Sequence, residues 1–400
     1  MEKQELVDFI KDHLYDDPVS LRLSKHKFKG SIDLEFAITQ IRARRKFNKK
    51  LSRLIDNSAF LFPDLLSGEQ ASHQAVAIFH ASLLQDAKNI IDLTSGLGID
   101  TFAFASIDGT TIKALDIIAE KTKVLKENAL SLGLQNIEAI NQEAFSYINN
   151  NNNSFDLIFV DPARRDASKN RVYNLLDCSP DVISFQDILL SRASRVLIKA
   201  SPLLDITRTL KDFKNIASIR TVGVKGECKE VLIELSNNTG SSILLEAVNL
   251  DNEGNILSKF SITPEEVSSQ PRYIKNRTEI FEDSKQELYL LEPSAMVMKL
   301  APWSKISEEF NALKFDKSSH LFVSGTKPSN FPGRVTRIIR QIKKSDWKSF
   351  AGFPASVVSK NHPLSSEEIR KSLKLKEGDN NFIYASRIDS KNIILLSEVC

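Results

Sequence analysis

Short apolar runs alternate with amphipathic stretches through the middle of this 400-residue chain. The apolar runs predict strands at residues 90–93, 111–116, 137–140, 155–160, 194–199 and 230–235. Among them, the spacing of apolar positions predicts helices at 74–84 and 118–132. Because strands that alternate with helices form a mostly parallel sheet covered on both faces, residues 71–240 are predicted to be one α/β domain.

The two ends of the chain have different patterns. Residues 1–70 carry short amphipathic runs and predict a helical region. After residue 240 the alternation typical of strands returns around 242–258 and mixed elements follow, which predicts an α+β module over residues 241–400. In this module we predict helices at 294–300 and 367–373 and strands at 321–324, 382–386 and 392–396.

The strand at 90–93 leads into a glycine-bearing turn that opens a helix, in the run Asp92-Leu93-Thr94-Ser95-Gly96-Leu97-Gly98-Ile99-Asp100. Gly96 would allow a tight turn, and Gly98 the close approach of a ligand to the main chain. A dinucleotide loop would carry a third glycine where this chain has Thr101, and a phosphate loop would need Gly-Lys-Ser or Gly-Lys-Thr. The turn therefore predicts a site for a nucleoside-bearing cofactor other than NAD.

Three further loops follow later strands at the same predicted edge of the sheet. Asp116 ends the second strand, about 20 residues after the glycines, where open α/β folds bind ribose hydroxyls. Glu143 and Ala144 follow the third strand and would flank an adenine, and Asp161 and Pro162 follow the fourth. The simpler alternative is that the carboxylates of these loops only cap helices or lie in solvated turns.

Taken together, the four loops resemble those of class I S-adenosylmethionine-dependent methyltransferases. The resemblance implies a Rossmann-like fold and S-adenosylmethionine as the cofactor. Two positions depart from the usual pattern, because Thr94 and Asp100 stand where many of these enzymes have glycines. The cofactor-binding residues that the resemblance implies are Asp92, Thr94, Gly96, Gly98, Asp100, Asp116, Ile117, Glu143 and Ala144.

The fourth loop, residues 161–165 (Asp-Pro-Ala-Arg-Arg), faces the transferable methyl group in related enzymes. Methylation of an exocyclic amine needs acceptors that orient its lone pair, and the Asp161 carboxylate and Pro162 carbonyl would supply them. Amine methyltransferases usually have an aromatic residue where this chain has Arg164, which would stack on a base or hold a phosphate instead. The resemblance thus implies Asp161, Pro162 and Arg164 as the catalytic residues.

Asp-Pro-Ala-Arg is also similar to the Asp-Pro-Pro-Arg of RNA uracil carbon-5 methyltransferases, which need a cysteine nucleophile after the fifth strand. Here Ala200 stands at that position, so the covalent route lacks its attacking group. Cys178 lies downstream of the loop, but no neighbouring histidine or lysine in the sequence argues for an activated thiol. The Asp-x-Thr-x-Gly-x-Gly-x-Asp run at 92–100 is instead similar to that of some ribosomal RNA guanine amino-group methyltransferases.

The C-terminal part resembles the ferredoxin-like and THUMP-like modules that follow the methyltransferase domain in a group of bacterial proteins. The likeness rests on residues 291–295 (Leu-Glu-Pro-Ser-Ala), 331–334 (Phe-Pro-Gly-Arg) and 361–365 (Asn-His-Pro-Leu-Ser). Lys360 and His362 stand where that group usually has an arginine and an aromatic residue. Because THUMP domains bind structured RNA, the resemblance implies an rRNA or tRNA substrate.

Composition restricts the partners and the compartment. With 54 basic and 51 acidic residues the net charge is only +3, so global charge does not prove a nucleic-acid partner. Residues 41–50 nevertheless hold six cations in one predicted helix, which form either a solvated face or a phosphate-contacting patch. No apolar run approaches the ~20 residues that span a bilayer, and three distant cysteines favour a reducing compartment. We therefore predict a cytoplasmic protein, and, since no histidine or cysteine pair has metal-ligand spacing, no bound metal.

The sequence favours a methyltransferase that binds S-adenosylmethionine at the loops over residues 92–144 and methylates an RNA base amine oriented by Asp161. Two alternatives stay open: an RNA-binding assembly or regulatory factor with a vestigial cofactor site, and a small-molecule methyltransferase. The sequence does not decide the oligomeric state.

Overall fold

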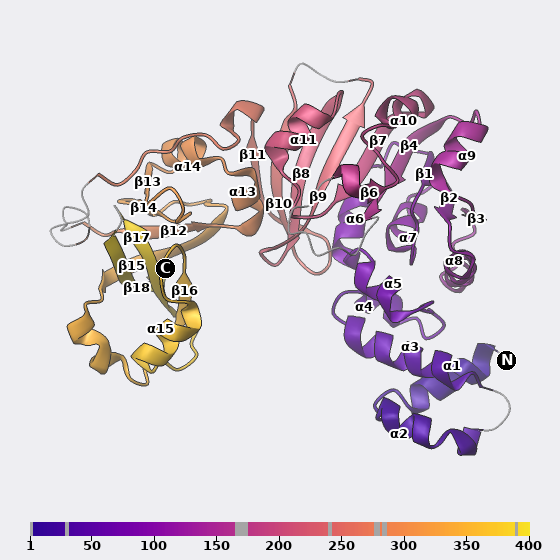
Figure 1. Cartoon of the computed structure of the whole chain (residues 1–400), viewed down its shortest axis with the longest axis horizontal. Helices are drawn as coiled ribbons and strands as arrows, with labels where there is room; N and C mark the ends of the chain where they lie inside the picture. The colour runs from indigo at the N-terminus through magenta and orange to yellow at the C-terminus, as the bar shows by residue number, and fades with distance from the viewer. Residues whose placement is uncertain are drawn as a thin grey trace. The chain divides into compact units, whose positions relative to one another are not determined.

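The computed structural model describes residues 3–28, 32–164, 175–238, 242–275, 281, 286–388 and 391–400. The chain divides into two compact units. The first comprises residues 1–225, 229–243 and 249–257, and the second comprises residues 226–228, 244–248 and 258–400. Figure 1 shows both units, coloured along the chain.

The larger sheet has nine strands in the order β11-β10-β8-β9-β7-β4-β1-β2-β3. Its strands are β1 (Asn89–Asp92), β2 (Thr111–Asp116), β3 (Ile137–Asn141), β4 (Phe155–Val160), β7 (Ala193–Ala200), β8 (Ile216–Val224), β9 (Glu227–Ser236), β10 (Leu244–Leu250) and β11 (Ile256–Ile262). Strands β3, β2, β1, β4 and β7 are parallel, and β9 is antiparallel to β7. The chain runs from β1 outward to β3 and then returns to β4, so the strand order reverses between β1 and β4, where open α/β sheets bind ligands. The predicted Rossmann-like α/β fold is confirmed.

Continuous apolar runs form the central strands because both faces of the sheet are covered. Consecutive residues of a strand point to opposite faces, and Ile90, Ile91, Leu157 and Ile158 are all fully buried. The helices between the strands are α6 (Gln74–Ser82), α7 (Ile99–Ala105), α8 (Ala119–Ser131), α9 (Ala144–Asn150), α10 (Gln186–Arg192) and α11 (Ile206–Asp212).

The sheet extends beyond the strands that the sequence predicted. Strand β8 was not predicted, because Ser218 and Arg220 interrupt its apolar pattern. Both donate hydrogen bonds to Glu234 on the neighbouring strand β9, at 2.9 and 3.0 Å, which satisfies these polar groups inside the sheet. The pattern around 242–258 was assigned to the C-terminal module, whereas the structure places β10 and β11 at the edge of this sheet.

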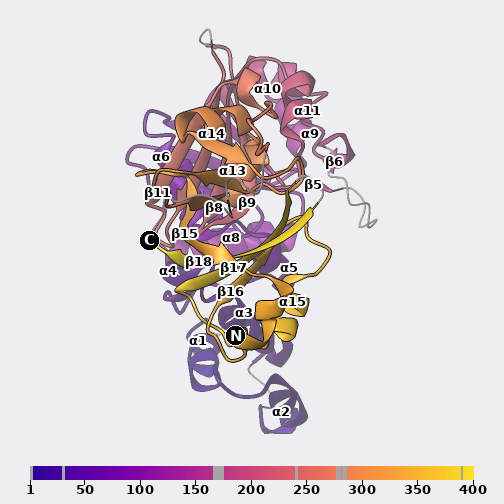
Figure 2. The same cartoon turned by 90° about the vertical axis from the view of Figure 1, so that its left-hand side faces the viewer.

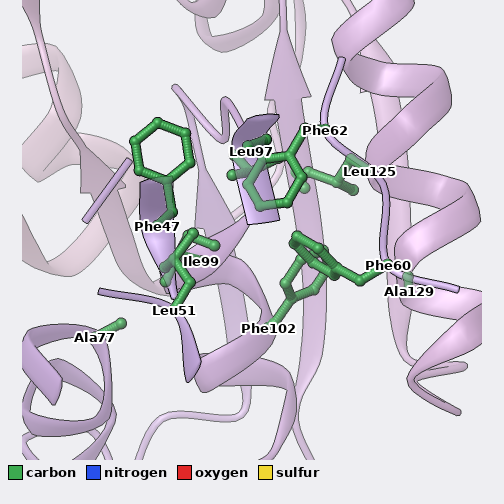
Figure 3. Close-up of a cluster of buried hydrophobic side chains, with 12 residues drawn as sticks. Phe47, Leu51, Phe60, Phe62, Ala77, Leu97, Ile99, Phe102, Leu125 and Ala129 are labelled. Carbon is green, nitrogen blue, oxygen red and sulfur yellow. The ribbon is translucent and has the colours of Figure 1, made fainter. Parts of the chain in front are cut away.

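The N-terminal region is helical, as predicted, and contains α1 (Lys3–Asp12), α2 (Pro18–Leu23), the 3₁₀ turn η1 (Lys25–Phe28), α3 (Leu34–Phe47), α4 (Ser52–Ile55) and α5 (Leu65–Gln70). Its side chains share one buried cluster with the glycine turn and α7, shown in Figure 3. Phe60 meets Phe62 and Phe102 edge to face, with ring centroids 5.3 and 6.2 Å apart. Leu97 and Ile99 of the glycine turn belong to the same cluster, so side chains of the N-terminal region pack against the turn.

The cations of residues 41–50 include several that bind the backbone of the chain itself. The buried Arg44 guanidinium donates to the carbonyls of Ile55, Ser58 and Phe60 at 2.8, 2.8 and 2.6 Å. The ammonium of Lys50 donates to the carbonyls of Gly68 and Glu69. These charges close the turns of the N-terminal region, a role that neither the solvated-face nor the phosphate-patch interpretation had assigned them.

The second unit contains a seven-stranded sheet in the order β13-β14-β12-β15-β18-β17-β16, of which β15, β18, β17 and β16 are labelled in Figure 2. Its strands are β12 (Tyr289–Pro293), β13 (Ala312–Lys314), β14 (Phe322–Ser324), β15 (Gly333–Gln341), β16 (Ser356–Ser359), β17 (Asn381–Ile388) and β18 (Lys391–Val399). Its helices are α13 (Ala295–Leu300), α14 (Trp303–Glu309) and α15 (Ser366–Leu373), with 3₁₀ turns η3 (Pro264–Glu266) and η4 (Lys344–Phe350). The predicted α+β architecture of the C-terminal part is confirmed.

Strand β15 was not predicted, because three arginines interrupt its apolar pattern. Arg334 pairs with Glu292, Arg337 with Glu398 and Arg340 with Asp346. Glu292 and Glu398 lie on the neighbouring strands β12 and β18, whereas Asp346 lies in η4. Opposite charges on neighbouring strands stabilise a sheet, so a segment interrupted by charged residues forms a strand here. In the described ranges no helix combines the length and the apolarity that a membrane span requires.

Candidate functional site

A cavity of about 1060 Å³ opens at the carboxyl ends of β1, β2, β3, β4 and β7. It lies within the first unit, at the point where the strand order reverses. The predicted site residues that line it are Asp92, Thr94, Gly96, Gly98, Asp100, Asp116, Ile117, Glu143, Ala144, Asp161 and Pro162. The remaining one, Arg164, has a side chain outside the described part of the chain.

The glycine turn adopts backbone conformations that favour glycine. Gly96 has a φ of 54° and Gly98 a φ of 88°. A Cβ atom at Gly98 would lie 2.7 Å from the Phe102 ring, which is closer than packed carbon atoms approach. The turn therefore needs glycine at position 98 for both its backbone and its packing, and it exposes bare main chain to the cavity.

Asp92 and Thr94 hold this turn in place. The Asp92 side chain is buried and accepts hydrogen bonds from the Thr101 hydroxyl at 2.6 Å and the Thr94 amide at 3.0 Å. Burial raises the pKa of Asp92 to about 7, although both hydrogen bonds favour the charged form. The Thr94 hydroxyl in turn accepts a 2.7 Å hydrogen bond from the Asp161 amide. Threonine at the usual glycine position thus joins the loop after β1 to the loop after β4.

Asp116 and Glu143 bind backbone amides at the cavity wall. Asp116 accepts from Gly96 at 3.1 Å and from Ile118 at 2.8 Å, so it ties the second loop to the glycine turn. Glu143 is the N-cap of α9 and accepts from the amides of residues 145 and 146. Capping, the simpler alternative for the carboxylates of these loops, describes the contacts of Glu143 but not those of Asp116, and both side chains line the cavity. Ile117 projects from the rim with 67% of its surface exposed.

The sequence did not predict a buried ionic cluster beside the cavity. His80 on α6 is fully buried, and its ring nitrogens bind Asp100 at 2.8 Å and Glu230 on β9 at 2.6 Å. Burial alone would lower the pKa of His80, but the two carboxylates outweigh it and raise the pKa to about 10. The Ser72 hydroxyl also donates to Asp100. At neutral pH the cluster is an imidazolium between two carboxylates that line the cavity.

A second ion pair joins Asp161 to Lys199 on β7. The Lys199 side chain is 13% exposed and that of Asp161 is 35% exposed, so the carboxylate is the more open partner. Burial raises the pKa of Asp161, and the Lys199 charge opposes that rise. For Lys199, burial alone would lower the pKa, but the neighbouring carboxylates, Asp161 foremost, raise it above its ordinary value.

The residues relevant to covalent catalysis lie nearby. Ala200 lines the cavity and presents a methyl group where a nucleophile would be required. Cys178 is fully buried on β6 (Cys178–Ser179), next to the 3₁₀ turn η2 (Leu175–Asp177). Strand β6 pairs with β5 (Ala163–Arg164) and brings Ser179 rather than Cys178 to the cavity lining. Within the described ranges, no three histidine, cysteine or acidic side chains are arranged to hold a metal ion.

Family models match both parts of the chain. Residues 84–293, more than half of the chain, match a methyltransferase domain, and residues 289–332 match a ferredoxin-like domain. A search of curated proteins by sequence found no match.

Solved structures similar to this chain include a "putative methyltransferase" from Porphyromonas gingivalis W83. It is 25% identical, the match covers 100% of this chain and 98% of that chain, and the TM-score is 0.84. An rRNA methylase from Streptococcus thermophilus is 16% identical over 40% of this chain and 94% of its own, with a TM-score of 0.30. A "putative methyltransferase" from Streptococcus mutans, in complex with SAH, is 12% identical over 39% of this chain and 94% of its own, with a TM-score of 0.31.

Proposed function

Because the chain belongs to the methyltransferase domain family and its cofactor is S-adenosylmethionine, we propose that it methylates an exocyclic amine of an RNA base. The observation that carries the proposal is the position of Asp161. Its carboxylate lies in the cavity at the end of β4, held by Lys199 and by the hydrogen bond from its own amide to Thr94. An acceptor that needs orientation by a carboxylate, and no covalent activation, suits this loop.

The cavity fits the proposed cofactor. When bound, S-adenosylmethionine supplies a methyl group on a positively charged sulfur. The bare backbone at Gly96 and Gly98 gives room for close approach, and Asp116 lies where a ribose would be bound. Asp92 and Asp100 contribute negative charge to the same wall, which favours a cationic ligand over a neutral one.

Asp161 and Pro162 are proposed to orient the acceptor. An exocyclic amine has two N–H donors. The carboxylate of Asp161 and the carbonyl of Pro162 offer two acceptors on neighbouring residues of one loop. With both N–H groups bound, the nitrogen lone pair is left to face the methyl group. Ala200 supplies no nucleophile, which argues against carbon-5 methylation of uracil.

The proposal of an RNA acceptor draws on the resemblance of the C-terminal part and on cations at the cavity. Lys121 and Lys229 line the cavity, where they would attract the phosphates that flank an acceptor base. Phosphate contacts release counterions, so binding of total RNA should weaken as salt is raised. A small-molecule acceptor would lack this salt dependence.

Transfer of a labelled methyl group to total RNA from a strain that lacks this protein tests the proposal. We expect label in a guanosine or adenosine amine when the nucleosides are separated by mass spectrometry, and none with Asp116→Ala, which should lose cofactor affinity. Label in small molecules alone would overturn the RNA proposal. Cofactor binding without any transfer would favour an RNA-binding assembly factor.

The affinity for S-adenosylmethionine is expected to depend on pH through Asp92. Its pKa is raised to about 7, so the carboxyl is neutral below pH 7 and charged above it. Because the cofactor carries a positive sulfur, affinity should rise from pH 6 to pH 8, by at most about tenfold per pH unit. Calorimetry at several pH values measures this. Asp92→Asn should bind weakly and without that pH dependence, and an equally flat profile in the wild type would contradict the assignment.

A further inference from the structure

We propose that Lys199 is a positioning residue that keeps Asp161 ionised and aimed at the acceptor amine, an inference that rests on the proposed function. In amine methyltransferases that the fourth loop resembles, an aromatic residue contributes to holding the acceptor, and this chain has none at that position. Here the partly buried ion pair between Asp161 and Lys199 orders the loop instead. The acceptor class that fits is a neutral amine that loses a proton when it is methylated.

The register of the sheet places the two side chains together. Strands β4 and β7 are parallel neighbours in which Val160 pairs with Ile198. Asp161 is the first residue after β4 and Lys199 is the next residue of β7, so the two lie side by side at the carboxyl edge of the sheet. The Asp161 main chain is fixed independently, because its amide donates to the Thr94 hydroxyl at 2.7 Å. The glycine turn therefore holds the Asp161 backbone, and strand β7 holds its carboxylate.

Nearby carboxylates disfavour the ionised form of Asp161, and the Lys199 charge opposes their effect. Asp100 on α7 and Glu230 on β9 interact electrostatically with Asp161 and disfavour its ionised form, and Asp161 disfavours the ionised form of Asp92 at the end of β1. Among the side chains that the structure describes, Lys199 is the cation that forms an ion pair with Asp161. The other nearby cation, His80, forms its ion pairs with Asp100 and Glu230 and not with Asp161. Removal of the Lys199 charge would leave Asp161 among like charges and favour its protonated form.

The ionised form is the one that the reaction requires. The amine nitrogen gives its electron pair to the methyl carbon, and the carbon–sulfur bond breaks with its electrons remaining on sulfur. The nitrogen then carries a positive charge and releases one proton. An ionised Asp161 accepts that proton and passes it to water through the open side of the cavity, whereas a protonated Asp161 offers one N–H acceptor fewer and cannot take the proton.

The test compares Lys199→Met, which keeps the length of the side chain without its charge, with Lys199→Arg, which keeps the charge. Lys113→Met is the matched control, because Lys113 lies on β2 of the same sheet and pairs with Glu138 outside the cavity. The full-length protein carries ¹³C at the aspartate carboxyls, and Asp161→Asn identifies the Asp161 resonance. If Lys199→Met does not fold, Lys199→Gln, which retains a hydrogen-bond donor, replaces it.

We expect the carboxyl resonance of Asp161 to titrate at higher pH in Lys199→Met than in the wild type. Lys199→Arg and Lys113→Met should titrate as the wild type does. The rate of RNA methylation by Lys199→Met should be at least about tenfold lower than that of the wild type at pH 6.5 and should approach the wild-type rate at pH 9. The cofactor affinity of the variant should equal that of the wild type.

The two proposals fail separately. An unmoved Asp161 resonance in Lys199→Met overturns the role of Lys199, whether or not RNA is methylated. A moved resonance in a protein that transfers no methyl group to RNA supports the role of Lys199 and overturns the proposed acceptor. A rate loss in Lys199→Met that is equal at every pH would assign Lys199 a structural role only.

Discussion

Replacing Asp161 with asparagine is expected to lower the methyl-transfer rate by about 10²–10⁴-fold while cofactor affinity stays within a few-fold of the wild type. Asparagine has nearly the shape of aspartate, but it offers one acceptor oxygen in place of two and cannot take up a proton at neutral pH. It also leaves Lys199 beside a neutral group. Single-turnover transfer to RNA with saturating cofactor measures the chemical step, and calorimetry measures cofactor binding.

Asp156→Asn is the matched control for this variant. Asp156 lies near the start of the same strand, where it accepts hydrogen bonds from the amides of Lys88 and Asn89, both at 2.8 Å, and it does not line the cavity. This control should retain the rate of transfer. A retained rate in Asp161→Asn would place the acceptor elsewhere, and a lost cofactor affinity would make Asp161 a cofactor ligand.

Replacing His80 with leucine is expected to lower the free energy of unfolding by about 3–5 kcal/mol. Leucine fills a similar volume but leaves Asp100 and Glu230 buried without the imidazolium between them. Breaking a buried ionic cluster by removal of one member is costly, because the remaining charges keep their desolvation penalty. Urea unfolding at pH 7 measures the loss. His73→Ala, at the N-cap of the same helix, is the control, because it removes the hydrogen bond that His73 accepts from the Ala75 amide and should cost about 1 kcal/mol.

The pH dependence of stability identifies the His80 contribution. The pKa of His80 is about 10 in the folded chain against 6.5 in its ordinary state. Its stabilising contribution is therefore complete below pH 6.5 and is lost as the pH rises from 6.5 to 10. The wild type should lose stability over that range, and His80→Leu should lose correspondingly less. Parallel profiles for the two proteins would mean that His80 is neutral in the folded state.

The sequence predicted elements well where apolar residues follow one another without interruption. The predicted bounds of β2 and β4 agree with the structure, those of β1 and β7 differ by one residue at each end, and that of β3 differs by one residue at its carboxyl end. Strands β8 and β15 escaped prediction for a common reason: charged side chains interrupt their apolar patterns, and most of the partners of those side chains lie on neighbouring strands. Such pairs become visible only when the sheet is assembled, so an apolar pattern alone does not reveal them.

The site shows the same division between local and long-range information. Each loop that follows a strand was predicted as part of one edge, because the carboxyl ends of parallel strands lie together. His80, Glu230 and the Asp161 contact of Lys199 were missed. His80 lies 150 residues from Glu230 in the sequence and its partner is set by the fold. The sequence signal that could have revealed these residues is a charged residue inside an apolar segment, because charged side chains are almost never buried without a partner.

The Thr94 hydroxyl links the loop after β1 to the loop after β4. One loop is proposed to receive the cofactor and the other the acceptor, and a single 2.7 Å hydrogen bond from the Asp161 amide fixes one to the other. A change that reshapes the acceptor loop for a new target would therefore disturb the cofactor loop as well. Substitutions that alter acceptor specificity without disturbing cofactor binding are therefore expected in parts of the cavity that do not contact Thr94.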